Sequence, residues 1–75
     1  MFNKKVLEVR IKEPFGTIGV NYVLRKVNET PLAQVDRIFS TGSAVYMYIA
    51  VPFKSIGTHL IKTIRGNYIH KIDWL

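Results

Sequence analysis

The sequence contains no cysteine, which excludes disulfide bonds, thiolate nucleophiles and cysteine-ligated zinc sites. It also lacks any apolar run near the ~20 residues that a membrane-spanning helix needs. The basic start Met1–Lys5 is not followed by the apolar segment of a signal peptide, because apolar and charged residues alternate from Val6 to Lys12. We therefore expect a cytoplasmic protein that has no membrane partner.

Patterns typical of catalysis or of cofactor binding are missing as well. The two histidines, His59 and His70, would need two of the five carboxylates to complete a metal site. Asp36 and Asp73 do not have the spacing of a catalytic carboxylate pair, and Gly16–Gly19 lacks the lysine and the length of a phosphate-binding loop. We expect a protein that is not an enzyme and that binds no cofactor and no metal.

The chain is short and basic. Its 75 residues are too few to divide between two hydrophobic cores, so residues 1–75 are expected to form one domain. Eleven Lys and Arg against five Asp and Glu give a net charge of +6 and favour anionic partners such as nucleic acids. The same charge would also be consistent with a role in solubility alone.

Alternation of apolar and polar residues predicts the first two strands. Leu7, Val9 and Ile11 alternate with charged residues, which predicts a strand over residues 5–12 with one buried face. After a turn at Glu13–Gly16, the period-two pattern of Ile18, Val20, Tyr22 and Leu24 predicts a second strand. The other face of this second strand is partly apolar, which would suit burial on both sides or a dimer contact.

A third and a fourth strand are predicted on either side of a hairpin. The third covers about residues 32–39, after the turn cluster Asn28–Pro31. Thr41-Gly42 is a hairpin signal, because glycine accepts the positive φ that such turns use. Residues 44–51 form the most apolar segment and are expected to be a central strand.

The segment between Pro52 and Gly66 has the period of a helix. Ile56, Leu60 and Ile64 share one face, which we expect to pack on the side of the fourth strand formed by Val45, Met47, Ile49 and Val51. Gly57 weakens a helix by up to ~1 kcal/mol relative to Ala, which suggests that the helix approaches the sheet closely there. Residues 68–75 alternate and predict a short last strand or an extended tail.

The connections between the first four strands are too short for parallel crossovers, so neighbouring strands should run antiparallel. The sequence therefore predicts an α+β fold, in which a small antiparallel sheet of four to five strands has one helix packed on one face.

The order of several short motifs resembles a known family. A Tyr46-Met47-Tyr48 strand follows a turn at Gly42, ends at Val51-Pro52 and leads into a helix that ends at Gly66-Asn67-Tyr68. In this order the chain resembles the KTSC domain, a small domain named for the C-terminus of some lysyl-tRNA synthetases. The similar part spans about residues 20–72, with the first strand as an addition. The resemblance implies a binding module for RNA rather than an enzyme.

Tyr46 and Tyr48 are the first candidate site residues. Two positions apart on a strand, their rings share one face, and the apolar side chains between them occupy the other. If that second face is the core, the tyrosines lie on the open side of the sheet, where aromatic rings can stack on unpaired bases. The alternative is that the two rings pack on the first strand or on the last residues of the chain.

Basic residues around the helix complete the predicted site. They could contact phosphates while an aromatic ring holds a base, and Tyr68, with Gly66 and Asn67, could contribute to the same site. The basic candidates are Lys54, Lys62, Arg65 and Lys71. The alternative interpretation is a solvated helix face whose charges complement the helix dipole.

Two functions are consistent with these patterns. The first is a small cytoplasmic module that binds RNA or another nucleic acid through basic residues and exposed tyrosines. The second is a protein-interaction module, such as a phage or mobile-element accessory protein that docks on a host protein or forms a homodimer. The apolar ending Ile72–Leu75 and the two apolar faces of the second predicted strand favour this second function.

Overall fold

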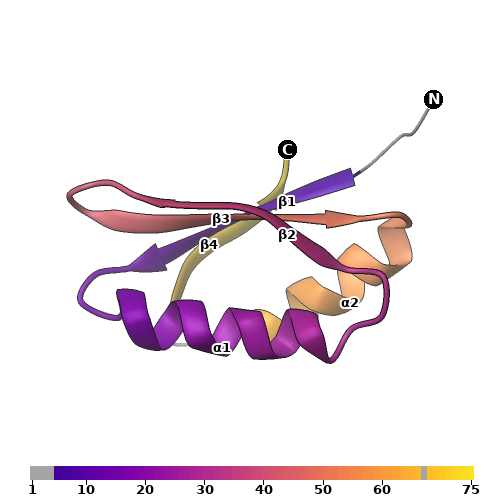
Figure 1. The fold of residues 1–75 in the computed structure, drawn as a ribbon, viewed down its shortest axis with the longest axis horizontal. Coiled ribbons are helices and arrows are strands. Elements are labelled where there is room, and N and C mark those ends of the chain that lie inside the picture. Colours follow the sequence, from indigo (N-terminus) through magenta and orange to yellow (C-terminus); the bar gives the residue numbers. More distant parts are fainter. Residues whose placement is uncertain (1–4, 67) are drawn as a thin grey trace.

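The computed structural model describes residues 5–66 and 68–75. Within these residues, six elements follow one another in the order strand, helix, strand, strand, helix, strand (Figure 1). The elements are β1 (Lys5–Lys12), α1 (Gly16–Asn28), β2 (Gln34–Ser40), β3 (Ala44–Val51), α2 (Lys54–Ile64) and β4 (Ile69–Trp74). Neither helix is long and apolar enough to cross a membrane within this described part of the chain.

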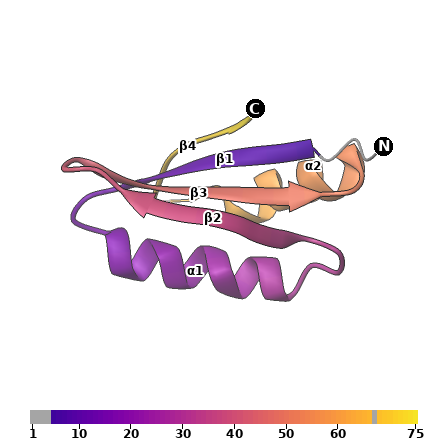
Figure 2. The ribbon, with the colours of Figure 1, turned by 45° about the horizontal axis from the view of Figure 1, so that its top comes forward.

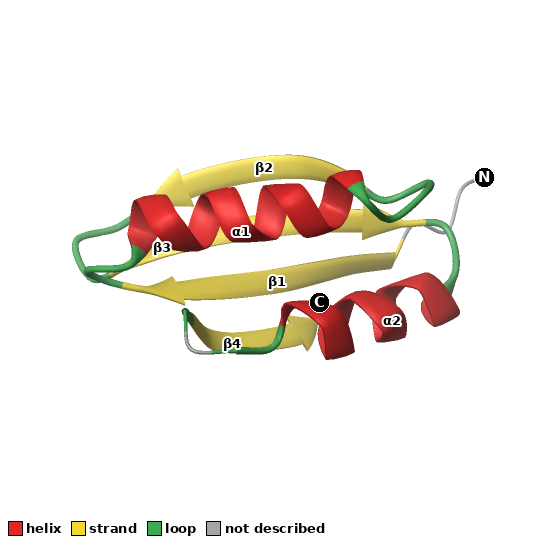
Figure 3. Cartoon of the chain, turned by 90° about the horizontal axis from the view of Figure 1, so that it is seen from below, coloured by secondary structure: helices red, strands yellow, loops and turns green. Residues whose placement is uncertain are grey.

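The four strands form one sheet in the order β2-β3-β1-β4, and every neighbouring pair runs antiparallel. Each helix connects two strands that have a third strand between them, which is the ferredoxin-like, split βαβ arrangement. Both helices lie on the same side of the sheet, where α1 packs against β1, β2 and β3 and α2 packs against β1, β3 and β4 (Figure 3). The predicted α+β class with a small antiparallel sheet is confirmed.

The core lies between the sheet and the two helices. Leu7, Val9 and Ile11 are fully buried, as the alternation in β1 predicts, and so is Met47 at the centre of β3. The helix residues Leu60 and Ile64 belong to the same cluster, with Ile56 packed at its border. The predicted packing of this helix on β3 is therefore confirmed.

The prediction of a strand over Ile18–Leu24 is wrong, because this segment belongs to helix α1. Its buried residues are Gly16, Gly19, Val23 and Val27, which recur with the helical spacing of three and four. A Cβ atom at Gly19 would overlap Ile11 Cγ2, so this glycine allows the helix to approach β1 closely. The structure thus has two helices on the sheet where the sequence predicted one.

Gly57 has a similar role in α2. A Cβ at this position would overlap the ring of Trp74 on β4 and would lie 2.7 Å from its Cζ2 atom. The predicted close approach of the helix to the sheet is confirmed, and the indole ring of Trp74 is the group that fills the space.

The hairpin between β2 and β3 forms where Thr41-Gly42 predicted it, but the reason given for it is wrong, because Gly42 does not have a positive φ. The backbone N–H of Thr41 donates to the carbonyl oxygen of Ala44 at 2.9 Å, and its hydroxyl donates to the same oxygen at 3.3 Å. The first strand, β1, lies at the centre of the sheet between β3 and β4. The two central strands, β1 and β3, therefore carry side chains on both faces of the sheet.

Candidate functional site

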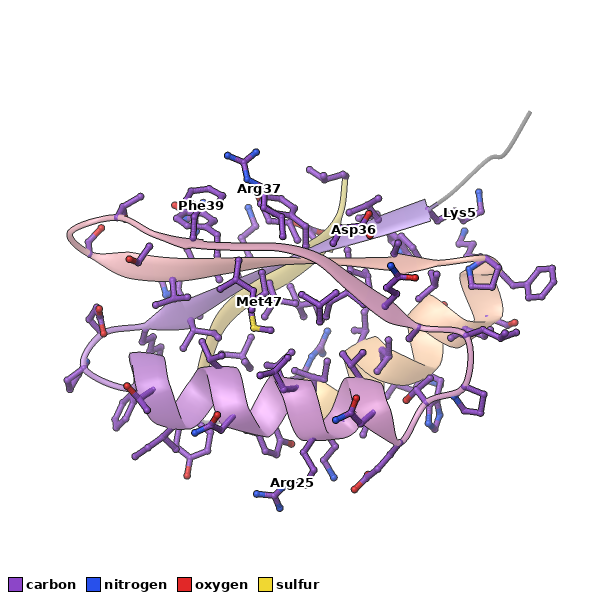
Figure 4. The ribbon with its side chains drawn as sticks, viewed as in Figure 1. Lys5, Arg25, Asp36, Arg37, Phe39 and Met47 are labelled. Carbon is purple, nitrogen blue, oxygen red and sulfur yellow. The ribbon has the colours of Figure 1, made fainter. Side chains whose placement is uncertain are left out.

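One face of the sheet has no helix over it in the described part of the chain (Figure 2). Figure 4 shows Arg37 and Phe39 projecting from this open face, whereas Met47 lies between the sheet and the helices. Tyr46 and Tyr48 flank the buried Met47 on a regular strand, so they project from the open face as well. Each of the two tyrosines is half-buried.

The aromatic side chains of the open face stack on one another. Phe39 on β2 is paired with Tyr46 on β3, and their rings lie 5.1 Å apart between centroids at an interplanar angle of 8°. The ring of Tyr48 lies 5.8 Å from that of Phe39, at an angle of 18°. Because stacked rings keep one another in place, the three side chains form a fixed aromatic group, which we call the ring stack.

Two guanidinium groups cover ring faces of this stack. Arg10 on β1 has its Cζ 5.0 Å from the centroid of the Tyr46 ring, and Arg37 on β2 has its Cζ 4.9 Å from the centroid of the Phe39 ring. Arginine is well suited to this position, because its planar group stacks on an aromatic face and keeps its N–H donors for other partners. The ring stack is therefore flanked by two cations.

Glu8 is the acidic partner of the ring stack. The phenolic hydroxyl of Tyr48 donates a hydrogen bond to Glu8 Oε2 at 2.8 Å. This hydrogen bond, together with desolvation and the negative charge of Glu8, raises the pKa of Tyr48 above its ordinary value. The hydrogen bond thus fixes the orientation of one ring from the neighbouring strand.

Strand register divides the charges of the open face into two rows. One row crosses the sheet with an aromatic half and a basic half: Phe39, Tyr46, Arg10 and Lys71. The next row has charges of both signs: Arg37, Tyr48, Glu8 and Asp73. Lys71 and Asp73 form an exposed ion pair at 3.7 Å. Anions should be attracted mainly to the first row, beside the ring stack.

The residues predicted as one site are distributed over two layers of the structure. Tyr46, Tyr48 and Lys71 lie on the open face, Tyr46 and Lys71 in one row. The other basic candidates, Lys54, Lys62 and Arg65, belong to α2 or its C-terminal end, in the layer on the opposite side of the sheet. The predicted grouping of the helix cations with the two tyrosines is therefore not what the structure shows.

Tyr68 is also separate from the open face. Its ring makes edge contacts with Phe15 and Tyr22, at centroid distances of 5.7 and 5.8 Å. The hydroxyl of Tyr22 donates to the carbonyl oxygen of Thr63 at 3.0 Å, so this aromatic cluster joins α1 to α2. Tyr68 thus has a structural contact, and Asn67 beside it lies outside the described residues.

The structure adds three residues that sequence reasoning did not place in the site: Phe39, Arg10 and Arg37. The alternation along the first strand already placed Arg10 opposite the buried face. For Phe39, the hairpin at Thr41-Gly42 was the available signal, because it sets the register with Tyr46. The same register extends to Arg37, which pairs with Tyr48, because the bulge in β2 lies beyond it, between Val35 and Arg37.

Comparisons with known protein families, with curated proteins and with solved structures find no match to this chain. The case for a function therefore depends on the geometry of the described residues. Its centre is the open face with the ring stack, the two flanking arginines and Lys71.

Proposed function

We propose that this chain is a non-catalytic cytoplasmic module that binds single-stranded RNA, or another single-stranded nucleic acid, on the open face of the sheet. The observation that carries the proposal is the ring stack with two guanidinium groups over its rings, on a sheet face that the helices leave uncovered. The rings and charges of this face are sufficient for binding, and the proposed role does not require catalysis.

Unpaired bases would bind to this face by stacking. Bases stack on aromatic rings and on guanidinium planes, and each contact contributes roughly 1 to 3 kcal/mol with little dependence on base identity. The rings here already contact one another and Arg37 lies over Phe39, so a base would stack on the Arg37 guanidinium or take its place over the ring. Binding would therefore require a movement of one exposed side chain and no change of the backbone.

Phosphate groups would be attracted by the basic residues of the same face. Arg10 and Lys71 lie side by side in the register, and Lys12 follows Arg10 on the same side of β1. The net charge of +6 would add long-range attraction for a polyanion. Glu8 and Asp73 lie in the neighbouring row and would repel phosphates, which favours a path of the strand along the basic row.

Two analogies support the proposal. RNA-recognition motifs bind single-stranded RNA with aromatic side chains on a four-stranded sheet, as proposed here. This is a likeness of architecture, and an architecture alone does not establish a function. The resemblance of residues 20–72 to the KTSC domain points to RNA as well, and the two tyrosines of its Tyr46-Met47-Tyr48 motif belong to the ring stack.

The alternative of a protein-interaction module has lost part of its support. The two apolar faces assigned to a second strand belong to helix α1, which buries one of them on the sheet. In the apolar ending, Trp74 packs on Gly57 of α2, which leaves Leu75 as its strongly exposed residue. We therefore prefer nucleic-acid binding, and a partner protein or a homodimer becomes the interpretation if that binding is absent.

Salt dependence of affinity tests the proposed function. A fluorescently labelled single-stranded oligonucleotide is titrated at several salt concentrations, with a duplex of the same sequence as the control. If about four phosphates are neutralised, the plot of log K against log salt should have a slope of roughly −3 for a single strand. Absence of binding to any single strand at low salt, or an affinity that salt does not change, would contradict the proposal.

A further inference from the structure

A cavity of about 320 Å³ opens near the point where β1 ends and the β2–β3 hairpin turns. Tyr46 lines this cavity and also belongs to the ring stack. The polar, charged and aromatic side chains that line the cavity are Arg10, Lys12, Glu13, Ser43, Tyr46 and His70. Such a volume is at the small end of the range of about 300 to 1,000 Å³ for ligand sites, and it suits a single charged group with its neighbours.

Arg10 is one of the residues that line this cavity, and it has an unused donor. Its Nε atom is buried and has no hydrogen-bond partner among the described residues. The guanidinium lies over the Tyr46 ring, with Cζ 5.0 Å from the ring centroid. A buried donor without an acceptor is unfavourable, so a small shift of the guanidinium that brings it to an acceptor supplied by a ligand would be favourable.

The charge of the cavity favours an anion. Lys12 adds a second cation, and Ser43 and His70 add polar groups at the rim. Among the described residues that line the cavity, Glu13 is the one carboxylate. A Cβ at Gly16 would lie 2.9 Å from Glu13 Oε1, which places this oxygen beside the start of α1, where the positive end of the helix dipole offsets its charge.

We propose that this cavity binds a phosphate group of the nucleic-acid strand. Arg10 would donate to the phosphate oxygens, and Lys12 would act as a point charge beside it. The inference rests on the proposed function and adds the place at which a phosphate of the bound strand would lie. Because Tyr46 belongs to both the ring stack and the cavity wall, a strand with a base on the stack would place a phosphate at the hairpin end of β1.

The first test compares matched variants on the two sides of the sheet. Ser43→Glu adds a carboxylate at the cavity, and Ser55→Glu adds the same group at an exposed position of α2. Both are measured for thermal stability and for affinity to a labelled single-stranded oligonucleotide. Ser43→Glu should weaken binding by roughly tenfold or more through repulsion of the phosphate, whereas Ser55→Glu should have a much smaller effect.

A second pair of variants counts phosphate contacts. Lys12→Gln should reduce the slope of log K against log salt by about 0.7, the contribution of one phosphate on a single strand. Lys62→Gln removes the same charge from an exposed position of α2 and should leave the slope unchanged. This pair keeps the test valid if the carboxylate introduced at Ser43 impairs folding.

Oligonucleotides with different ends identify the source of the phosphate. If the cavity takes a terminal phosphate, an oligonucleotide with a 5′- or a 3′-phosphate should bind more tightly than one with hydroxyls at both ends. If it takes a phosphate from within the strand, the three oligonucleotides should bind alike, and Ser43→Glu should weaken all of them equally.

The outcomes separate the two proposals. If single strands bind to the parent, but Ser43→Glu and Lys12→Gln behave like their controls on α2, the phosphate subsite is wrong and the proposed function stands. If no single strand binds to the parent protein, both proposals fail. Selective loss of affinity in Ser43→Glu, with a reduced salt slope in Lys12→Gln, supports both.

Discussion

Phe39 on β2 and Tyr46 on β3 face one another across the hairpin, with ring planes 8° apart and centroids 5.1 Å apart. This contact joins an edge strand to a central strand on the face that has no helix over it. Each of the two rings also has an arginine over it, Arg37 over Phe39 and Arg10 over Tyr46. The same contact thus contributes to stability and forms the surface that we propose for bases.

Removal of a tyrosine ring should affect binding more than stability. Tyr46→Ala and Tyr48→Ala should each weaken RNA binding by about 1 to 3 kcal/mol, because each removes part of the stacking surface. The half-buried rings should contribute only about 1 to 2 kcal/mol to the free energy of unfolding. Thermal melting and RNA titration of the same purified variants distinguish the two effects.

A well-folded Tyr46→Ala protein that binds RNA as tightly as the parent would exclude a role of this ring in binding. A loss of stability of about 3 to 5 kcal/mol, as expected for a fully buried aromatic residue, would instead show that the ring belongs to the core.

Leu60 should be essential for folding. This side chain is fully buried between α2 and the sheet, so Leu60→Ala should lower the free energy of unfolding by about 2 to 5 kcal/mol, enough to unfold a domain of this size. Thr58→Ala, at an exposed position of the same helix, is the control and should change little. Thermal melting followed by circular dichroism measures both variants, and an unchanged midpoint for Leu60→Ala would contradict the packing of α2.

Gly57 and Trp74 should be strongly coupled. Gly57→Ala should destabilise the protein by about 1 to 3 kcal/mol, because the added methyl overlaps the indole ring. In a Trp74→Leu background the ring is absent, and the same change should be neutral or should stabilise the helix by up to about 1 kcal/mol. Chemical denaturation of the four proteins in this cycle gives the coupling energy, and additive effects would argue against the contact.

The hydrogen bond between Tyr48 and Glu8 should be visible in the titration of the tyrosines. Its raised pKa means that the folded state favours the protonated phenol, so the associated stability is present below the ordinary tyrosine pKa of 10.0 and is lost as pH rises through the raised value. Glu8→Gln should move the pKa of Tyr48 downward. Carbon-13 NMR of the tyrosine rings measures this shift, with Glu29→Gln on the helix side as the control; equal titration of both variants would contradict the interaction.

Local patterns were sufficient for most of the fold. Alternation over Lys5–Lys12 predicted β1, the apolar composition of Ala44–Val51 predicted β3, and the spacing of Leu60 and Ile64 predicted α2. In β1 and α2 the side chains that face the core differ from their neighbours in polarity, so the period is visible in the sequence.

Helix α1 was missed although its period is present in the sequence. Val20, Val23, Leu24 and Val27 recur at i, i+3, i+4 and i+7, as on one face of a helix, and all four lie in or against the core. The alternation of Ile18 with every second residue up to Leu24 competes with this pattern, and two of the four buried positions are glycines that contribute no apolar side chain to it. Gly16 and Gly19 are explained by contact with Val45 and Ile11, and the contact with Ile11 exists only after the helix has packed on β1.

The candidate site was predictable to a similar extent. The shared face of Tyr46 and Tyr48 follows from the strand period and is confirmed by the burial of Met47 between them. The position of Arg10 and Lys71 beside Tyr46 depends on pairing between strands that are distant in the sequence, so no local pattern could reveal it. The same pairing explains why the cations of α2 lie in another layer.

The most direct test of the account is a map of the binding surface by NMR. Nitrogen-15-labelled protein is titrated with a short single-stranded RNA, and the backbone amide shifts are followed residue by residue. We expect the largest changes in β1, β3 and the β2 residues around Phe39, with small changes along α1 and α2. Changes confined to the two helices, or no changes at RNA concentrations far above those of the protein, would contradict the proposal that the open face binds nucleic acid.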